Sequence, residues 1–357
     1  MHIGIAGAGL LGRLLAFELA RTGHSVEVFD PAPGPQAPAA GSGPAYAAGW
    51  TAAGMLSPTA ELESADDNVF ALGLRSLELW PHIVAALGQP VELHRRGSLL
   101  LAHRGDEGAA RRVVDLLQHK APADHAPQAL DAAALRQLEP AIHGPVQAWL
   151  LPHEGQIHSM QAMTALAHAA DAAGARFHWG LTVQRLQAGE FRTPQGLHRF
   201  DCVFDVRGTG ARPALADRSP ADGFTPEVRG VRGEIFWLHA PGVLLKRPVR
   251  LLHPRHRVYI VPREGDQIVV GASEIESEDR SPVSLRSTVE LLAAAHSIIP
   301  ELAESRVIHS ESNLRPALPD NLPRVEQGPG LVRINGLFRH GWLIAPALVE
   351  QALKDLA

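Results

Sequence analysis

Hydrophobic and polar positions at the start of the chain predict a strand, a helix and a second strand. A short apolar run covers residues 2–6, and apolar side chains then recur at helical spacing as far as Gly23. The residues at this helical spacing are Leu10, Leu11, Leu14, Leu15 and Leu19. A second apolar run at 25–29 ends in Asp30. This order is typical of the first half of a nucleotide-binding α/β domain.

Three glycines between the first strand and the helix, Gly7, Gly9 and Gly12, have the spacing G-x-G-x-x-G. In a dinucleotide-binding turn the first allows a tight bend, the second lets a pyrophosphate approach the backbone, and the third lets the helix pack closely on the sheet. The helix N-terminus adds free N–H groups and a partial positive charge. Asp30 lies where an acid accepts hydrogen bonds from an adenosine ribose, which favours FAD or NAD over NADP. A glycine-rich turn without a ligand is the weaker alternative, because it leaves the flanking strands and the acid unexplained.

The middle of the chain alternates predicted helices with short strands. Helices are predicted at 66–87, 107–119, 131–139 and 160–173, and strands at 97–102, 147–151, 176–179, 182–186 and 201–206. A loop rich in proline, alanine and glycine follows Asp30, a turn is expected at 154–158, and a second glycine-rich turn follows residue 206.

The pattern changes to longer strands after residue 228. Strands at 234–239, 249–252, 258–262, 267–272 and 306–314 predict an antiparallel sheet, with one helix at 284–296. A buried strand at 331–336, a turn at 339–342 and a helix at 345–356 close the chain. Because this last strand and helix repeat the opening pattern, the nucleotide-binding domain is predicted to be discontinuous.

Composition and charge narrow the class of protein. The 357 residues are 45% hydrophobic and 20% charged, as in globular proteins with more than one core. A formal net charge of −5 gives no indication of binding to nucleic acid. The single cysteine, Cys202, excludes an internal disulfide and a cysteine-rich metal site, and the scattered histidines predict no metal site of their own. Without a signal peptide or a membrane span, a cytoplasmic location is expected.

Several segments, in one order along nearly the whole chain, resemble the glycine oxidase branch of the D-amino-acid oxidase family of FAD enzymes. Besides the glycine motif, these segments are 52–58 (AAGMLSP), 258–263 (VYIVPR), 268–272 (IVVGA), 314–321 (LRPALPDN) and 336–346 (GLFRHGWLIAP). The resemblance implies an α/β fold with a discontinuous Rossmann-like FAD-binding domain and an antiparallel-sheet α+β substrate domain. We place the FAD-binding domain at 1–80, 145–225 and 320–357, and the substrate-binding domain at 81–144 and 226–319.

The resemblance also implies an activity. A small amino acid (glycine, sarcosine or a small D-amino acid) is oxidised to an imine and then a 2-oxo acid, with oxygen as acceptor and release of hydrogen peroxide. In glycine oxidases the imine can feed synthesis of the thiamine thiazole. FAD is expected to be non-covalent, because Cys202 lies in a predicted nucleotide-domain strand. The resemblance favours a homo-oligomer, whereas the residues themselves leave the oligomeric state open.

Three residues carry over as candidate catalytic residues. Arg315 stands where the family places the arginine that grips the substrate carboxylate, and a planar guanidinium can pair both carboxylate oxygens. Tyr259 matches an active-site tyrosine whose hydroxyl helps to hold the same carboxylate. Arg339 matches an arginine near the flavin or the substrate. The structural alternatives are an arginine that ties loops together, a core tyrosine, and an arginine paired with an acid elsewhere.

Further residues carry over as contacts of FAD. Ala52, Ala53, Gly54 and Met55 are expected to pack against the flavin ring, and Val183 to contact the adenine side. Backbone N–H groups from Gly341 to Ile344, with a helix start near Pro346, are expected to face the flavin N1–C2=O region. The full set of expected contacts is Gly7, Gly9, Leu10, Leu11, Gly12, Asp30, Ala52, Ala53, Gly54, Met55, Val183, Gly208, Gly336, Arg339, His340, Gly341, Trp342, Leu343 and Ile344.

Other readings of the chain stay open. His340 and Trp342 stand where glycine oxidases often carry smaller or different residues, which bears on the substrate rather than on the flavin. The same fold also serves dehydrogenases that pass electrons from an amino acid to a quinone or a protein. It serves tRNA-modifying oxidases too, against which the net negative charge argues. An NAD-dependent dehydrogenase is not expected to have the closing Arg-His-Gly-Trp segment.

Overall fold

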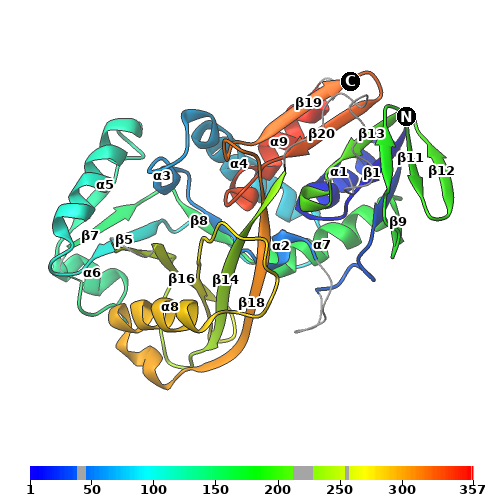
Figure 1. The fold of residues 1–357 in the computed structure, drawn as a ribbon. Helices are drawn as coiled ribbons and strands as arrows, with labels where there is room; N and C mark the ends of the chain where they lie inside the picture. The colour runs from blue at the N-terminus through cyan, green and yellow to red at the C-terminus, as the bar shows by residue number, and fades with distance from the viewer. Residues whose placement is uncertain (38–45, 146, 212–227, 254–256, 355, 357) are drawn as a thin grey trace.

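A six-stranded sheet with the order β19-β20-β13-β1-β2-β9 forms one half of the chain (Figure 1). The computed structural model describes all residues except 38–45, 146, 212–227, 254–256, 355 and 357, so much of the loop predicted after Asp30 lies outside the described residues. The strands are β1 (His2–Ala6), β2 (Ser25–Asp30), β9 (Arg176–Trp179), β13 (Cys202–Asp205), β19 (Arg324–Gly328) and β20 (Leu331–Asn335). Only β19 pairs antiparallel. The predicted discontinuous sheet is thus confirmed.

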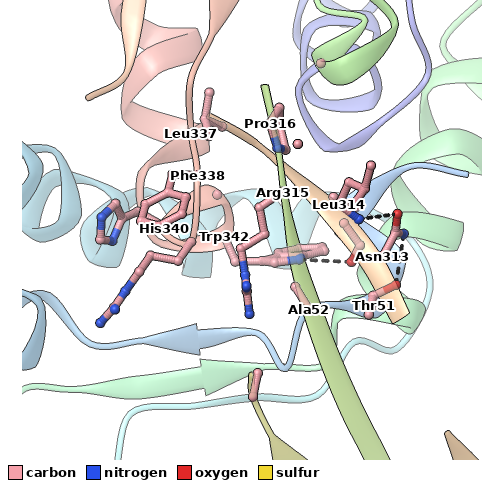
Figure 2. Close-up of a pocket in the computed structure, with 18 of the residues that line it drawn as sticks. Thr51, Ala52, Asn313, Leu314, Arg315, Pro316, Leu337, Phe338, His340 and Trp342 are labelled. Carbon is pink, nitrogen blue, oxygen red and sulfur yellow. Dashed lines mark hydrogen bonds between the residues drawn. The ribbon is translucent and has the colours of Figure 1, made fainter. Parts of the chain in front are cut away.

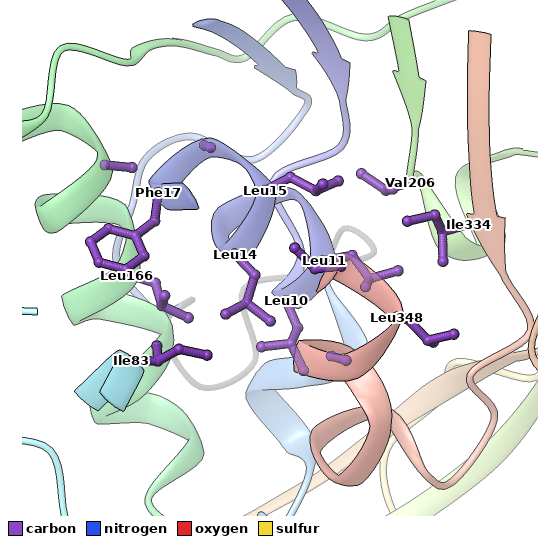
Figure 3. Packing of buried hydrophobic residues seen from close by; sticks show 14 of the residues in the cluster. Leu10, Leu11, Leu14, Leu15, Phe17, Ile83, Leu166, Val206, Ile334 and Leu348 are labelled. Atoms are coloured by element: carbon purple, nitrogen blue, oxygen red, sulfur yellow. The ribbon is translucent and has the colours of Figure 1, made fainter. Parts of the chain in front are cut away.

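Helices cover one face of this sheet. α1 (Leu10–Arg21) packs against α7 (Ser159–Ala172) and α9 (Gly341–Lys354), and α9 also packs against α4 (Asp67–Ala86). The leucine stripe predicted for the first helix explains the contact, because Leu14 and Leu15 are fully buried. Figure 3 shows the leucines of α1 among side chains of α4, α7 and α9.

A three-stranded antiparallel sheet covers the other face. It consists of β10 (Arg185–Gln187), β11 (Glu190–Thr193) and β12 (Gly196–Arg199). Phe191 and Phe200 pack with Phe29 of β2 in one apolar cluster. The sequence analysis predicted only one strand here, at 182–186, because the outward side chains are polar and each strand is short.

The second large sheet has eight strands in the order β18-β14-β17-β16-β15-β5-β7-β6. They are β5 (Ser98–Ala102), β6 (Gln128–Leu130), β7 (Gln147–Leu151), β14 (Arg229–His239), β15 (Val249–Leu252), β16 (Arg257–Arg263), β17 (Gln267–Gly271) and β18 (Arg306–Ala317). All neighbours are antiparallel except β5 and β15. The domain boundary expected at 145 places β7 with the nucleotide-binding half, whereas its pairing with β5 puts it in this sheet.

Alternation along β16 gives the two faces of this sheet different roles. Val258 and Ile260 join the core under α8 (Leu285–Ile298). Tyr259 and Val261 point the other way, into a cluster with Ala53. The helices α5 (Glu107–Lys120) and α6 (Ala132–Leu138) lie near the far end of the sheet (Figure 1).

A small sheet lies between the two halves. Its strands are β3 (Met55–Leu56), β8 (Gly155–Ile157) and β4 (Leu93–His94), in the order β3-β8-β4. The turn predicted at 154–158 is therefore wrong for 155–157, where the backbone pairs on both sides. The buried Arg263 donates to the carbonyl oxygens of Ala53 and Ile157, which fixes this sheet against β16. Within the described residues, no helix is both long and apolar enough to cross a membrane.

Gly12→Ala should strongly destabilise the protein, because a Cβ at this position would overlap the carbonyl oxygen of Gly7. Backbone on both sides of the contact leaves no flexible side chain to move away. Gly108→Ala is the matched control, since Gly108 is exposed within α5 and its added Cβ would meet nothing within 4 Å. Thermal unfolding should show a large loss for Gly12→Ala and a gain of about 0.5–1 kcal/mol for the control. Equal stabilities would contradict the close contact.

Candidate active site

A cavity of about 1040 Å³ lies between the two large sheets. It extends from the glycine turn after β1 to Arg315 in β18, and Figure 2 shows part of its lining. Ligand pockets in proteins commonly measure about 300–1,000 Å³. This cavity is therefore large enough for a dinucleotide together with a small second molecule.

The glycine turn forms one end of the cavity. Gly7 has a φ of 105°, which favours glycine, and Gly12 packs on the Gly7 carbonyl without lining the cavity. A Cβ added to Gly9 would meet only the Cβ of Ala47, at 3.5 Å, so open space lies over its backbone. The α1 N-terminus begins at Leu10, and both Leu10 and Leu11 line the cavity. A pyrophosphate fits this space, as the G-x-G-x-x-G spacing predicts.

Asp30 lines the same end and organises the turn. Its two carboxylate oxygens accept hydrogen bonds from the backbone N–H groups of Ala8, at 2.6 Å, and Ala32, at 2.8 Å. These contacts fix the carboxylate at the carboxyl end of β2, beside Gly7. The predicted contact with a ribose remains a prediction.

The middle of the cavity is lined by the segment from Ala52 to Met55. Gly54 has a φ of 67°, and a Cβ there would overlap the carbonyl oxygen of Ile157. The Gly54 carbonyl accepts a hydrogen bond from Ile157 N at 2.8 Å. Small side chains thus let this backbone lie close to β8 on one side and to the cavity on the other.

Val183 and Gly208 also line the cavity, and Arg207 connects them. Its guanidinium makes two contacts of 2.8 Å with Asp205 and donates to the Val183 carbonyl oxygen at 3.1 Å. This contact explains the arginine in the second glycine turn. Gly336 does not line the cavity: its φ is 78°, and a Cβ there would lie 2.7 Å from the Leu322 carbonyl oxygen.

The last helix begins earlier than predicted. α9 starts at Gly341 rather than at 345, and Pro346 lies inside it. Gly341, Trp342 and Leu343 line the cavity, and their N–H groups belong to the first turn, where a helix has no internal acceptors. The expectation for Ile344 is wrong, because its N–H bonds to the His340 carbonyl oxygen at 3.0 Å and its side chain is fully buried.

Trp342, a predicted contact of FAD, also packs against other parts of the protein. The indole Nε1 donates to the Gly49 carbonyl oxygen at 3.1 Å, and the ring stacks on Trp80 at a centroid distance of 5.5 Å. Figure 2 shows this indole on the cavity wall. Trp342 therefore fixes the start of α9 against α2 (Ala48–Thr51) and α4.

Arg315 and Tyr259 line the opposite end of the cavity. Arg315 lies over Gly233 of β14, where a Cβ would be 2.5 Å from its Cζ atom. Its Nη1 donates to the carbonyl oxygens of Ser273, at 3.1 Å, and Arg232, at 3.3 Å. In the described part of the chain, no carboxylate lies within 4.0 Å of this guanidinium. It is thus placed to bind an anion.

Burial shifts the pKa values of Tyr259 and Arg315 in opposite directions. Burial raises the pKa of Tyr259, although Arg315, Arg250 and Arg339 oppose that shift. Burial lowers the pKa of Arg315, and Tyr259 and Glu274 oppose it. An arginine remains protonated at neutral pH even so. The end of the cavity therefore presents a phenol O–H and a guanidinium, both hydrogen-bond donors.

Glu61, which the sequence analysis left without a role, is the buried acid of this end. Arg250 approaches it at 2.8 Å, Arg339 at 3.0 Å and His340 Nδ1 at 3.2 Å. Burial alone would raise the pKa of Glu61, but Arg339, Arg250 and His340 hold it well below its usual value. Arg339 also contacts Glu274 at 3.2 Å. The acid-paired alternative for Arg339 is thus what the structure contains, at the cavity wall.

Four residues of this end had no signal in the sequence: Glu61, Gly233, Arg250 and Glu274. They lie far apart in the chain, and each looks like an ordinary strand or loop residue. Only the pairing of β14 with β18, and the approach of the segment before α9 to β15, brings them to one place. No group of three potential metal ligands occurs among the residues that the structure describes.

Comparison with known proteins identifies this arrangement. The sequence matches the family described as FAD dependent oxidoreductase (DAO) over residues 2–352. The chain belongs to this family. The resemblance found in the sequence is therefore confirmed, and the protein is an FAD-dependent oxidoreductase.

Similar proteins cover nearly the whole chain. A protein of Rhizobium etli, whose name assigns it to thiamine biosynthesis as the oxidoreductase ThiO, is 38% identical over 100% of this chain and 96% of its own length. A glycine oxidase of Geobacillus kaustophilus is 28% identical over 96% of this chain and 89% of its own length. A crystal structure of glycine oxidase from that species has a TM-score of 0.83, covering 99% of this chain and 93% of that chain at 27% identity.

The lining of the cavity fits the cofactor of the family. The open space over Gly9 and the N-terminus of α1 would hold the pyrophosphate, and Asp30 the ribose. The segment from Ala52 to Met55 and the first turn of α9 would hold the flavin ring. Cys202 is buried in β13 and does not line the cavity, in keeping with non-covalent FAD.

Gly9→Ala should keep the fold and weaken FAD binding. The added methyl group meets only Ala47 in the protein, but it occupies the space over the backbone that a pyrophosphate needs. We expect the dissociation constant of FAD to rise by about tenfold or more, equivalent to about 1.4 kcal/mol. Fluorescence titration of the cofactor-free protein measures this, with its thermal unfolding as the control for folding. Unchanged affinity would place the phosphates elsewhere.

Glu61→Gln should destabilise the protein by about 3 kcal/mol, because it leaves the partly buried Arg250 without its carboxylate and Arg339 with only the half-exposed Glu274. The folded-state pKa of Glu61 lies below its unfolded value of about 4.3, so its stabilisation is complete above that pH and is lost as pH falls through the folded pKa. Urea unfolding should therefore show a constant difference from wild type above about pH 5 and a smaller one in stronger acid. A difference that grows on acidification would contradict this assignment.

Proposed function

We propose that the protein oxidises a small α-amino acid, such as glycine, sarcosine or a small D-amino acid. The product is an imine that hydrolyses to a 2-oxo acid and an amine or ammonia. Molecular oxygen is the final electron acceptor and leaves as hydrogen peroxide. The name of the Rhizobium etli relative supports a further step of this proposal, in which the imine serves synthesis of the thiamine thiazole.

The observation that supports this function best is the unpaired guanidinium of Arg315. It faces a cavity next to the proposed flavin site and has no carboxylate within 4.0 Å among the described residues. A substrate carboxylate supplies the missing partner through two charge-assisted hydrogen bonds. Tyr259 adds a third donor, since burial keeps its hydroxyl protonated.

Binding in this way orients the rest of the substrate. With its carboxylate at Arg315, the α-carbon of a small amino acid lies toward the segment from Ala52 to Met55. Bound FAD supplies the acceptor for the hydride that leaves this carbon. The protein positions the substrate and excludes water from it, and an amine that binds in its neutral form needs no separate base.

Arg315→Met should weaken binding of the amino acid by about 1.5–3 kcal/mol, about 10- to 150-fold, because a hydrogen-bonded charge is lost. Binding of FAD should stay unchanged, since Arg315 lies at the other end of the cavity. Gly233→Ala is a second test: it keeps the guanidinium but displaces it from its place over β14, so it should also raise KM. Steady-state kinetics with glycine and sarcosine measure both effects, and a normal KM in both variants would contradict the assignment.

Anaerobic addition of glycine, sarcosine and small D-amino acids tests the function directly. A substrate should bleach the flavin absorbance, and air should restore it with formation of peroxide. If bleaching occurs but air does not restore the colour, the acceptor is a quinone or a protein. If none of these amino acids bleaches the flavin, the proposed substrate class is wrong.

A further inference from the structure

We propose that Glu274, at the edge of the cavity near Arg315, restricts the substrate to amino acids with a single carboxylate. This inference rests on the proposed function and names a class of substrate within it. Glu274 follows Ser273, whose carbonyl oxygen accepts the hydrogen bond from Arg315. Its side chain lines the cavity and is 47% exposed, so an entering ligand passes close to its carboxylate.

The arginines that line the cavity differ in whether a carboxylate holds them. Besides Arg315, six arginines among the described residues line it, and those from β15, β16 and the segment before α9 pair with acids that also line it. The ion pairs are Arg250 with Glu61 at 2.8 Å, Arg257 with Glu63 at 3.2 Å, and Arg339 with Glu61 at 3.0 Å and Glu274 at 3.2 Å. Each of these three guanidinium groups is thus held by at least one carboxylate. Arg315 differs from them, because no carboxylate lies within 4.0 Å of it among the described residues.

A second carboxylate beside Arg315 would meet Arg339, whose charge acts on Arg315. The Nε and Nη2 of Arg339 already contact Glu61, and its Nη1 contacts Glu274. The negative charge of Glu274 would repel such a group at the point where it must enter. Glu274 therefore acts twice: it occupies Arg339, and it opposes a further anion.

Removing the charge of Glu274 should weaken the preference for a single carboxylate. Glu274→Gln frees the Nη1 of Arg339, which would then offer a second carboxylate site beside Arg315. At an effective protein dielectric of about 20, loss of a unit charge a few ångströms away changes the binding of another charge by about tenfold or more.

Glu276→Gln is the matched control. Glu276 also lines the cavity, two residues further along the same loop, and its side chain is 67% exposed. It pairs at 2.9 Å with Arg229, which does not line the cavity. The two variants thus remove the same charge from one loop but only one of them releases Arg339.

The experiment compares ligands that differ by one carboxylate. Acetate and malonate, which cannot be oxidised as amino acids, are titrated into the FAD-loaded protein, and their dissociation constants are read from perturbation of the flavin spectrum. Sarcosine and iminodiacetate, the second of which adds one carboxylate to the first, provide kcat/KM values for turnover. Because acetate and malonate bind without being oxidised, their dissociation constants test this inference independently of the proposed function. The proposed function fails separately, if neither glycine nor sarcosine bleaches the flavin.

We expect wild type to bind acetate at least about tenfold more tightly than malonate. Glu274→Gln should reduce this preference by about tenfold and raise the iminodiacetate-to-sarcosine ratio of kcat/KM in parallel, whereas Glu276→Gln should change neither. Equal binding of acetate and malonate by wild type would overturn the inference. So would a Glu274→Gln variant whose preference matches that of Glu276→Gln.

Discussion

The buried carboxylate of Glu61 joins the two halves of the molecule. It forms ion pairs with Arg250 from the eight-stranded sheet and with Arg339 from the segment before α9, which belongs to the nucleotide-binding half. A carboxylate this deeply buried is costly unless its charge is matched, and here two guanidinium groups match it. The same contacts fix the wall of the cavity on the side where Arg315 and Tyr259 lie. The site therefore depends on a charge cluster that neither half could form alone.

Within this wall, Arg315 differs from its neighbours in one respect. Arg250 and Arg339 are held by acids, whereas the hydrogen bonds of Arg315 within the described residues go to the carbonyl oxygens of Arg232 and Ser273. Gly233 leaves the room in which its guanidinium lies. A cation that is positioned but not neutralised is what a site for a small carboxylate requires, because the ligand then supplies the missing charge.

The glycine-turn end of the cavity depends on close packing of backbone atoms rather than on ion pairs. Gly7 and Gly12 touch each other through a carbonyl, and Asp30 holds the turn by two backbone N–H groups. Over Gly9 the backbone is left open. The turn is thus rigid on the side of the protein and accessible on the side of the cavity, which suits it to hold a pyrophosphate without rearrangement.

The sequence by itself determined the opening βαβ unit, the glycine turn and the family, because these depend on local spacing and on motifs that remain contiguous. It also predicted one site for Arg315 and Tyr259, which line the same cavity. It misplaced the start of α9 and the strand at 155–157, since a glycine and a tryptophan before Pro346 and a short polar segment are weak local signals. Only the tertiary structure brought Glu61, Arg250, Gly233 and Glu274 to one cavity. Their contacts arise from pairing across sheets and between halves of the chain, and the sequence does not show which charges are partners until the fold brings them together.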